Sequence, residues 1–126
     1  MTTVGEIMST NLVTVEPSAT VAEAATVMGG RHVGSAVVCQ GETLAGIFTE
    51  RDILKALSQD FDAPGQPVSH WMTTNPTTVG PGTEVDEALG LMLGGGYRHL
   101  PVMEGDTILG MVSIRDLSRA ATERTD

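Results

Sequence analysis

Two copies of one short motif carry the residue types best suited to binding chemistry in this sequence. Thr49–Asp52 (TERD) and Ser113–Asp116 (SIRD) each place a hydroxyl three residues before a carboxylate, after an apolar run. Such a position predicts a helix N-terminus, with the hydroxyl as N-cap and the acid in the first turn. The N–H groups of a helix N-terminus also suit an anion, and a carboxylate there can accept the hydroxyls of a ribose. The motif alone therefore leaves open a structural cap and a nucleotide site.

The elements that must hold these motifs occur twice along the chain. Shifted by 64 positions, the sequence aligns with itself without a gap, and 18 of the 51 positions from Val4 to Leu54 are identical. In each copy, apolar residues at helical spacing alternate with β-branched runs joined by Gly-containing turns. The expected elements are leading helices at 4–8 and 68–72, first strands at 13–15 and 77–79, first helices at 21–28 and 85–92, hairpin strands at 36–39, 44–49, 100–103 and 108–113, and closing helices at 50–57 and 114–121.

Local signals predict where these helices begin and end. Thr20 with Glu23 fits a capping box, and Thr83 with Asp86 fits a looser version. The glycines at 29–30 and 94–96 predict helix ends. Residues 58–67 (SQDFDAPGQP) contain two prolines and two aspartates and predict a linker. The expected organisation is a first repeat at 1–57, a linker at 58–67 and a second repeat at 68–126.

One repeat has too little core to fold alone, because a three-stranded sheet with two helices buries a small apolar area. Two repeats must therefore pack together. We expect an α/β (α+β) module of two tandem β-α-β-β-α repeats, packed with pseudo-two-fold symmetry and leaving clefts between the halves.

Composition and charge exclude several classes of partner. The chain carries sixteen acidic and seven basic residues, a net charge of −9, and few aromatic residues, so nucleic acid is not an expected partner. No apolar run is long enough for a membrane span, and the N-terminus lacks the regions of a signal peptide. We expect a cytoplasmic protein with no membrane partner.

Metal binding and catalysis have no clear signature either. Cys39 is the single cysteine, and His32, His70 and His99 share no ligand spacing with it, so no metal site is expected. The sequence shows no nucleophile-and-base motif and no phosphate-binding loop of the Walker type. These absences favour a protein that is not an enzyme.

The whole pattern resembles the CBS-domain pair, or Bateman module, named for the domain in cystathionine β-synthase. The resemblance extends over about residues 4–121 and rests on the tandem period, on Met8-Ser9 and Met72-Thr73, on the strand start at 100–102 (LPV), and on the segments 46–52 and 110–116. It implies a regulatory module that binds AMP, ADP, ATP or S-adenosylmethionine in the inter-repeat clefts and alters contacts with a partner protein. It further implies no required cofactor, a homodimer, and a module without an attached catalytic or channel domain.

Carried over by position, the resemblance implies that Thr49 and Ser113 approach the ligand's phosphates. It implies that Asp52 and Asp116 bind its ribose. It also implies that the opposite repeat completes each site. The residues so implied are Thr49, Asp52, Thr74, Arg98 and His99 for one site, and Ser113, Asp116, Thr10, Gly34 and Ser35 for the other. Because Gly34 and Ser35 offer no cation, the Asp116 site is expected to be the poorer one for phosphate.

Two other function classes stay open at this point. The chain is an interaction or structural module with degenerate clefts if both motifs serve only as caps. A small enzyme would need a catalytic group that the sequence does not display.

Overall fold

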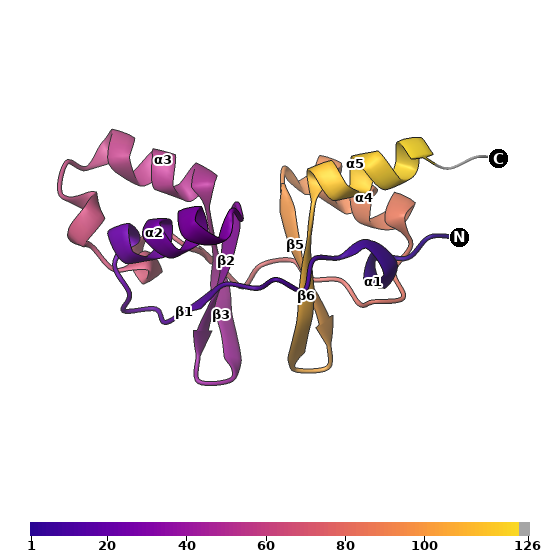
Figure 1. Cartoon of the computed structure of the whole chain (residues 1–126), viewed down its shortest axis with the longest axis horizontal. Coiled ribbons are helices and arrows are strands. Elements are labelled where there is room, and N and C mark those ends of the chain that lie inside the picture. Colours follow the sequence, from indigo (N-terminus) through magenta and orange to yellow (C-terminus); the bar gives the residue numbers. More distant parts are fainter. Residues whose placement is uncertain (124–126) are drawn as a thin grey trace. The chain divides into compact units, whose positions relative to one another are not determined.

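The computed structural model describes residues 1–123, which form two compact units (Figure 1). Leu12–Pro76 make up one unit, called here the N-unit. Met1–Asn11 join the chain from Thr77 onward in the other, called the C-unit. The compact units therefore differ from the sequence repeats, because each contains the leading segment of the other repeat. Residues 124–126 of the expected second repeat lie outside the described residues.

The N-unit is a four-stranded sheet covered by helices. Its strands are β1 (Thr14–Val15), β2 (Ser35–Gln40), β3 (Thr43–Thr49) and β4 (Thr73–Thr74), in that order, with β1 parallel to β2 and the other pairs antiparallel. Helices α2 (Val21–Arg31) and α3 (Glu50–Gln59) lie on the same side of the β2–β3 hairpin (Figure 1). Two 3₁₀ turns, η1 (Ala63–Gly65) and η2 (Val68–His70), lead from α3 to β4. The core includes Met28, Val38, Phe48 and Val68.

The C-unit repeats the hairpin and its two helices. Strands β5 (His99–Glu104) and β6 (Thr107–Ser113) form a two-stranded antiparallel sheet, flanked by α4 (Val85–Gly95) and α5 (Ile114–Glu123). The N-terminal helix α1 (Val4–Ile7) packs against α5 and β6 (Figure 1). Val4 is fully buried there, in a core with Met92, Leu100 and Leu117. Hence the first residues of the chain complete the hydrophobic core around the second hairpin.

Two of the predicted helix ends are wrong. Helix α2 does not end at Gly29-Gly30 but runs to Arg31, since His32 adopts the left-handed conformation (φ 56°) and its N–H donates to the carbonyls of Met28 and Gly29. Helix α4 begins after Glu84 rather than Thr83. The Thr83 hydroxyl instead accepts a hydrogen bond from the N–H of Gly80 (3.2 Å) in the preceding turn. By contrast, the capping box of Thr20 and Glu23 is confirmed.

The predicted first strand of the second repeat is also wrong. Residues 77–79 contribute one isolated parallel bridge, between Val79 and Val102, instead of a strand. The short strand lies earlier, at Thr73–Thr74, and pairs with β3. This placement gives sheets of four and two strands where two three-stranded sheets were expected. Among the described residues, no helix has the length and apolar character needed to cross a membrane.

Candidate functional site

The Thr49–Asp52 motif forms the junction between β3 and α3. Thr49 is the N-cap, and its hydroxyl oxygen accepts from the N–H of Asp52 (3.3 Å). In return the backbone N–H and the hydroxyl of Thr49 both donate to Oδ2 of Asp52, at 2.9 and 3.1 Å. Within residues 1–123 all these bonds use one carboxylate oxygen, so Oδ1 is left for another donor. The predicted cap is confirmed, and it fixes the carboxylate.

The Ser113–Asp116 motif forms the same junction between β6 and α5. The N–H of Ser113 donates to Oδ2 of Asp116 (3.1 Å), and the N–H of Asp116 donates to the Ser113 hydroxyl oxygen (3.1 Å). Both members of this pair are half-buried, as are Thr49 and Asp52. The two units therefore share the reciprocal pair of backbone N–H bonds at the start of their closing helices, and the Thr49 hydroxyl adds a third bond in the N-unit.

Asp52 lies in an environment that disfavours its charged form. Burial raises the pKa of Asp52 above its ordinary value of 3.8, against the hydrogen bonds from Thr49 and the charges of Lys55 and Arg51, which lower it. A half-buried carboxylate with a raised pKa gains from a ligand donor at its second oxygen. Such perturbed groups are frequent at binding sites, although structural networks also produce them.

The strand beside each motif brings further predicted residues next to it. Ser35 pairs with Thr49 across β2 and β3, and the carbonyl of Gly34 accepts from the N–H of Glu50 (3.0 Å). In the C-unit, His99 pairs with Ser113, and the carbonyl of Arg98 accepts from the N–H of Ile114 (2.9 Å). Thus Gly34 and Ser35 lie in the unit of Asp52, and Arg98 and His99 lie in the unit of Asp116. The expected approach of Arg98 and His99 to Asp52 stays a prediction.

The two leading segments bring Thr74 and Thr10 to the other edge of each motif-bearing strand. Thr74 pairs with Gly46 of β3, and Ser9, just before Thr10, exchanges two backbone hydrogen bonds with Met111 of β6 (2.9 and 3.0 Å). These approaches need a glycine, because a Cβ at Gly46 would collide with the carbonyl oxygen of Thr73.

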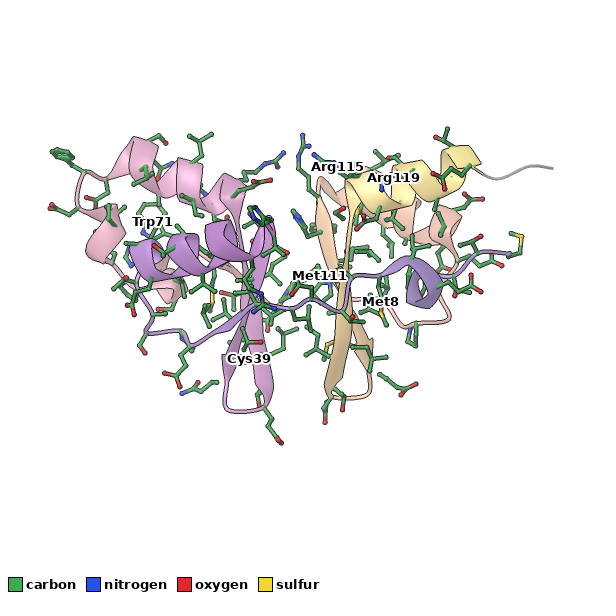
Figure 2. The ribbon with its side chains drawn as sticks, in the orientation of Figure 1. Met8, Cys39, Trp71, Met111, Arg115 and Arg119 are labelled. Carbon is green, nitrogen blue, oxygen red and sulfur yellow. The ribbon has the colours of Figure 1, made fainter. Side chains whose placement is uncertain are left out.

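A Cβ at Gly110 would likewise lie 2.7 Å from the Ser9 carbonyl oxygen and 2.7 Å from the Met8 sulfur. Figure 2 shows Met8 and Met111 in this part of the C-unit. The identical glycine in both repeats is the sequence signal for this packing.

The sequence did not predict that Glu50 and Ile114, the first residues of α3 and α5, lie beside the start of the hairpin in each unit, where their N–H groups donate to Gly34 and Arg98. A Cβ on Gly34 would lie 3.0 Å from Oε1 of Glu50, so the Glu50 carboxylate lies over the start of β2. The internal alignment could have pointed to these two residues, since Glu50 and Ile114 occupy equivalent positions 64 residues apart and differ in charge. No group of three His, Cys, Asp or Glu side chains suited to a metal occurs among the described residues.

The family is shown by comparison with known proteins. The model of the CBS domain matches the chain twice, over residues 4–59 and 68–123. The chain therefore belongs to the CBS-domain family, and its two domains form a tandem pair with a mixed α+β fold. An uncharacterised 17.7 kDa protein of Acidianus ambivalens is 44% identical over 122 residues, covering 94% of this chain and 73% of that protein.

Two similar solved structures contain adenosine compounds. The CBS-domain pair of protein MJ0100, in complex with 5′-methylthioadenosine and S-adenosyl-L-methionine, is 25% identical, with a TM-score of 0.89 and coverage of 99% of both chains. CBSX2 of Arabidopsis thaliana, in complex with AMP, is 27% identical, with a TM-score of 0.81 and coverage of 98% of both chains. These two proteins thus bind adenosyl small molecules, one of them with a phosphate and the other without.

Proposed function

We propose that this chain is a regulatory module that binds an adenosine-containing small molecule, AMP, ADP, ATP or S-adenosylmethionine, at its two S/T-x-x-D motifs. One observation carries the proposal: among the described residues, the capping residue of each motif holds the carboxylate through Oδ2, at a helix N-terminus. The remaining oxygen is held in place to accept a ribose hydroxyl, and the helix N–H groups favour an anion. The ligands of the two similar solved structures support the same class of molecule.

The proposed roles are those that the family resemblance implies. Asp52 and Asp116 hold the ribose, and the hydroxyls of Thr49 and Ser113 lie beside the phosphate or its substitute. Further proposed site residues are Gly34, Ser35 and Thr74 in the N-unit and Thr10, Arg98 and His99 in the C-unit. Thr74 and Thr10 are exposed, so their side chains are accessible to a ligand.

The proposed mechanism is a population shift rather than catalysis. A ligand that favours one conformation of the module over another changes the population of each, and the change alters contacts with a partner protein. No cofactor is required for this role. The proposal also includes a cytoplasmic location, which a single buried and unpaired Cys39 suits.

A second copy of the chain is the proposed partner for the outer face of α3. Leu54 and Leu57 are 70% and 51% exposed on this helix, and Phe61, just beyond its end, is 95% exposed. We call these three residues the α3 apolar face. Cyclic dimers are the commonest soluble oligomers, and exposed apolar patches often mark interfaces.

One observation favours a different function. The two motifs form complete N-terminal caps without any ligand. Cap stability alone therefore explains both hydroxyl–carboxylate pairs, as in an interaction module that binds no nucleotide.

Calorimetric titration of the purified chain with adenosine, AMP, ATP and S-adenosylmethionine separates these functions. Saturable binding of at least one compound, weakened by Asp52→Asn or Asp116→Asn, supports the sensor. Asn keeps the size of the side chain, and its amide oxygen can still accept from the N–H of Thr49 or Ser113. Heat signals indistinguishable from buffer for all four compounds support the interaction module.

A further inference from the structure

One glutamine side chain joins the end of α3 to the residue that precedes β4. The Nε2 group of Gln66 donates to Oδ2 of Asp60 (2.8 Å), and Oε1 of Gln66 accepts from the indole N–H of Trp71 (2.9 Å), which is labelled in Figure 2. We call these three half-buried residues the Gln66 bridge. An ionised carboxylate only accepts and an indole N–H only donates, so the amide fits between them in one orientation.

Both ends of the bridge are fixed by further hydrogen bonds. Asp60 is the C-terminal cap of α3, and its other oxygen, Oδ1, accepts from the N–H of Asp62 (2.8 Å). The hydrogen bonds from Asp62 and Gln66 lower the pKa of Asp60, so the bridge contains a charged acceptor at neutral pH. The carbonyl of Gln66 accepts from the N–H of Val21, the first residue of α2 (2.9 Å). Gln66 therefore connects α2, α3 and Trp71.

Trp71 leads through Met72 directly into β4. A Cβ at Gly46 of β3 would lie 3.0 Å from the sulfur of Met72 and would collide with the carbonyl oxygen of Thr73, so this segment lies close against β3. Strand β4 pairs with β3 over only two residues, Thr73 and Thr74. So short a pairing is weak by itself. The position of Thr74 therefore depends on how the chain just before it is held.

The leading segment of the first repeat cannot form an equivalent bridge. Shifted by 64 positions, Trp71 falls on Ile7 and Gln66 on Thr2, and the side chain of Ile7 has no hydrogen-bond donor. That segment is held in the C-unit through Val4, which is fully buried and whose N–H donates to the carbonyl of Thr83 (2.8 Å). The effect of the bridge should thus be confined to the N-unit.

We propose that the Gln66 bridge positions Thr74 for ligand binding by keeping β4 paired with β3. Asp60, Gln66 and Trp71 act through the strand and are positioning residues. When the bridge is broken, β4 separates from β3 more often. A ligand that binds only the paired form then binds more weakly, in proportion to the fraction that stays paired. This inference rests on the proposed function, in which Thr74 is a site residue.

Gln66→Met is the first test, because methionine keeps the length of the side chain and removes both hydrogen bonds. Hydrogen exchange in the peptide that contains β4 should accelerate about tenfold, as the loss of two ordinary hydrogen bonds does. Calorimetric titration of the full chain uses AMP and S-adenosylmethionine as probes. Binding at the site that Asp52→Asn weakens should become about two- to tenfold weaker, and binding at the site that Asp116→Asn weakens should not change.

A compensating pair of substitutions tests the bridge itself. Gln66→Glu alone should weaken binding, because a second carboxylate then faces Asp60 where a donor stood. Asp60→Asn alone should also weaken it, because the bridge then lacks one acceptor. Combined, the two changes exchange donor and acceptor: the new amide donates to the new carboxylate, which still accepts from Trp71. Affinity and exchange in the double variant should return to within about twofold of the wild type.

Matched controls separate the bridge from charge and from stability. Gln40→Glu and Asp62→Asn make the same chemical changes at exposed positions of the N-unit, and neither should alter affinity or the exchange of β4. Ala24→Gly, at a fully buried position of α2, lowers the stability of the same unit without removing a side chain of the bridge. It should leave the affinity of the folded protein unchanged.

Three results overturn the proposal. Unaltered affinity in Gln66→Met, with faster exchange of β4, removes the positioning role while the proposed function stands. A double variant that binds no better than its weaker single variant, or a loss in Ala24→Gly equal to that in Gln66→Met, shows that the bridge does not set the affinity. If neither compound binds the wild type, the proposed function fails and the positioning role fails with it, and the exchange of β4 alone decides whether the bridge holds the strand.

Discussion

Asp52 accepts both the backbone N–H and the hydroxyl of Thr49 at the same oxygen, Oδ2, at 2.9 and 3.1 Å. This geometry lets one residue pair form the cap and also take the proposed binding role. Oδ2 stabilises the start of α3, and Oδ1 is oriented without taking part in the cap. The carboxylate proposed to bind the ribose is thus also part of the cap, and mutation separates the two roles when stability and affinity are measured together.

Asp52→Ala and Asp116→Ala should each lower stability and each weaken a separate ligand site. Loss of a first-turn carboxylate and its cap bonds should cost about 1 kcal/mol of unfolding free energy. Loss of a charge-assisted bond to the ribose should reduce affinity about ten- to a hundredfold. Thermal melts and calorimetry on the same preparations measure both. Lower melting temperatures with unaltered affinity in both variants would show that the carboxylates only cap helices.

The raised pKa of Asp52 gives a pH dependence of known sign. Its folded-state pKa lies above 3.8, the ordinary value, so the folded protein takes up this proton before the unfolded chain does. The penalty of ionising Asp52 is therefore present at neutral pH and disappears as the pH falls through the folded-state pKa. The stability of the wild type relative to Asp52→Asn should rise as the pH is lowered from 7 toward about 4.

Paired denaturant titrations across this range measure the difference, in which the other acidic groups cancel. Those groups include Glu23 and Asp60, whose pKa values are lowered by hydrogen bonds and which act in the opposite direction. A difference that is flat or falls toward low pH would contradict the expected burial of the Asp52 charge.

Gly46→Ala should destabilise the N-unit and displace Thr74. The new methyl group would meet the carbonyl oxygen of Thr73, which is backbone and has little room to move, because it belongs to a strand paired with β3. Such overpacking typically costs about 1–3 kcal/mol. Gly90→Ala is the matched control, since nothing lies within 4 Å of its Cβ position in α4, and it should stabilise by about 1 kcal/mol. Urea unfolding measures both, and equal behaviour would contradict the close approach.

Local signals predicted much of this fold because their causes are local. The hairpins at 36–49 and 100–113, the capping box at Thr20 and the caps at Thr49 and Ser113 all follow from side chains within a few residues. The end of α2 failed as a prediction because His32, not glycine, takes the left-handed conformation there. The left-handed conformation that ends a helix is usually taken by glycine, but other residues also adopt it.

The leading segment of each repeat packs in the unit of the other repeat, and no local sequence signal predicts this. The internal alignment predicts a helix near Val4 and another near Val68 but not which core each helix joins, because that choice depends on tertiary packing. For the same reason the sequence could suggest site residues without assigning neighbours to them. The approach of Arg98 to Asp52 stays a prediction for this reason, and what the structure adds is that the carbonyl of Arg98 accepts from the N–H of Ile114 in its own unit.

The α3 apolar face should mediate dimer formation if a second copy covers it. Leu54→Ser combined with Leu57→Ser is expected to convert a dimer to a monomer, as measured by light scattering after size-exclusion chromatography. Leu93→Ser on α4 is the matched control, because Leu93 is 67% exposed, close to the 70% of Leu54. A monomeric wild type, or a dimer insensitive to the double change, would contradict this interface.

Val4→Ala should destabilise the C-unit, and Val68→Ala should destabilise the N-unit. Each residue thus affects the unit that contains the hairpin of the other repeat. Val4 is fully buried in the core of α4, α5, β5 and β6, while Val68 is fully buried with α2, β2 and β3. Removing two methyl groups from either core should cost about 2 kcal/mol. Hydrogen exchange should therefore accelerate in β6 and α5 for Val4→Ala, and in β2 and β3 for Val68→Ala. Val27→Ala, at a position 43% exposed on α2, is the control and should change little. Faster exchange in β2 and β3 upon Val4→Ala, with β6 and α5 unaffected, would show that the leading helix stays with its own repeat.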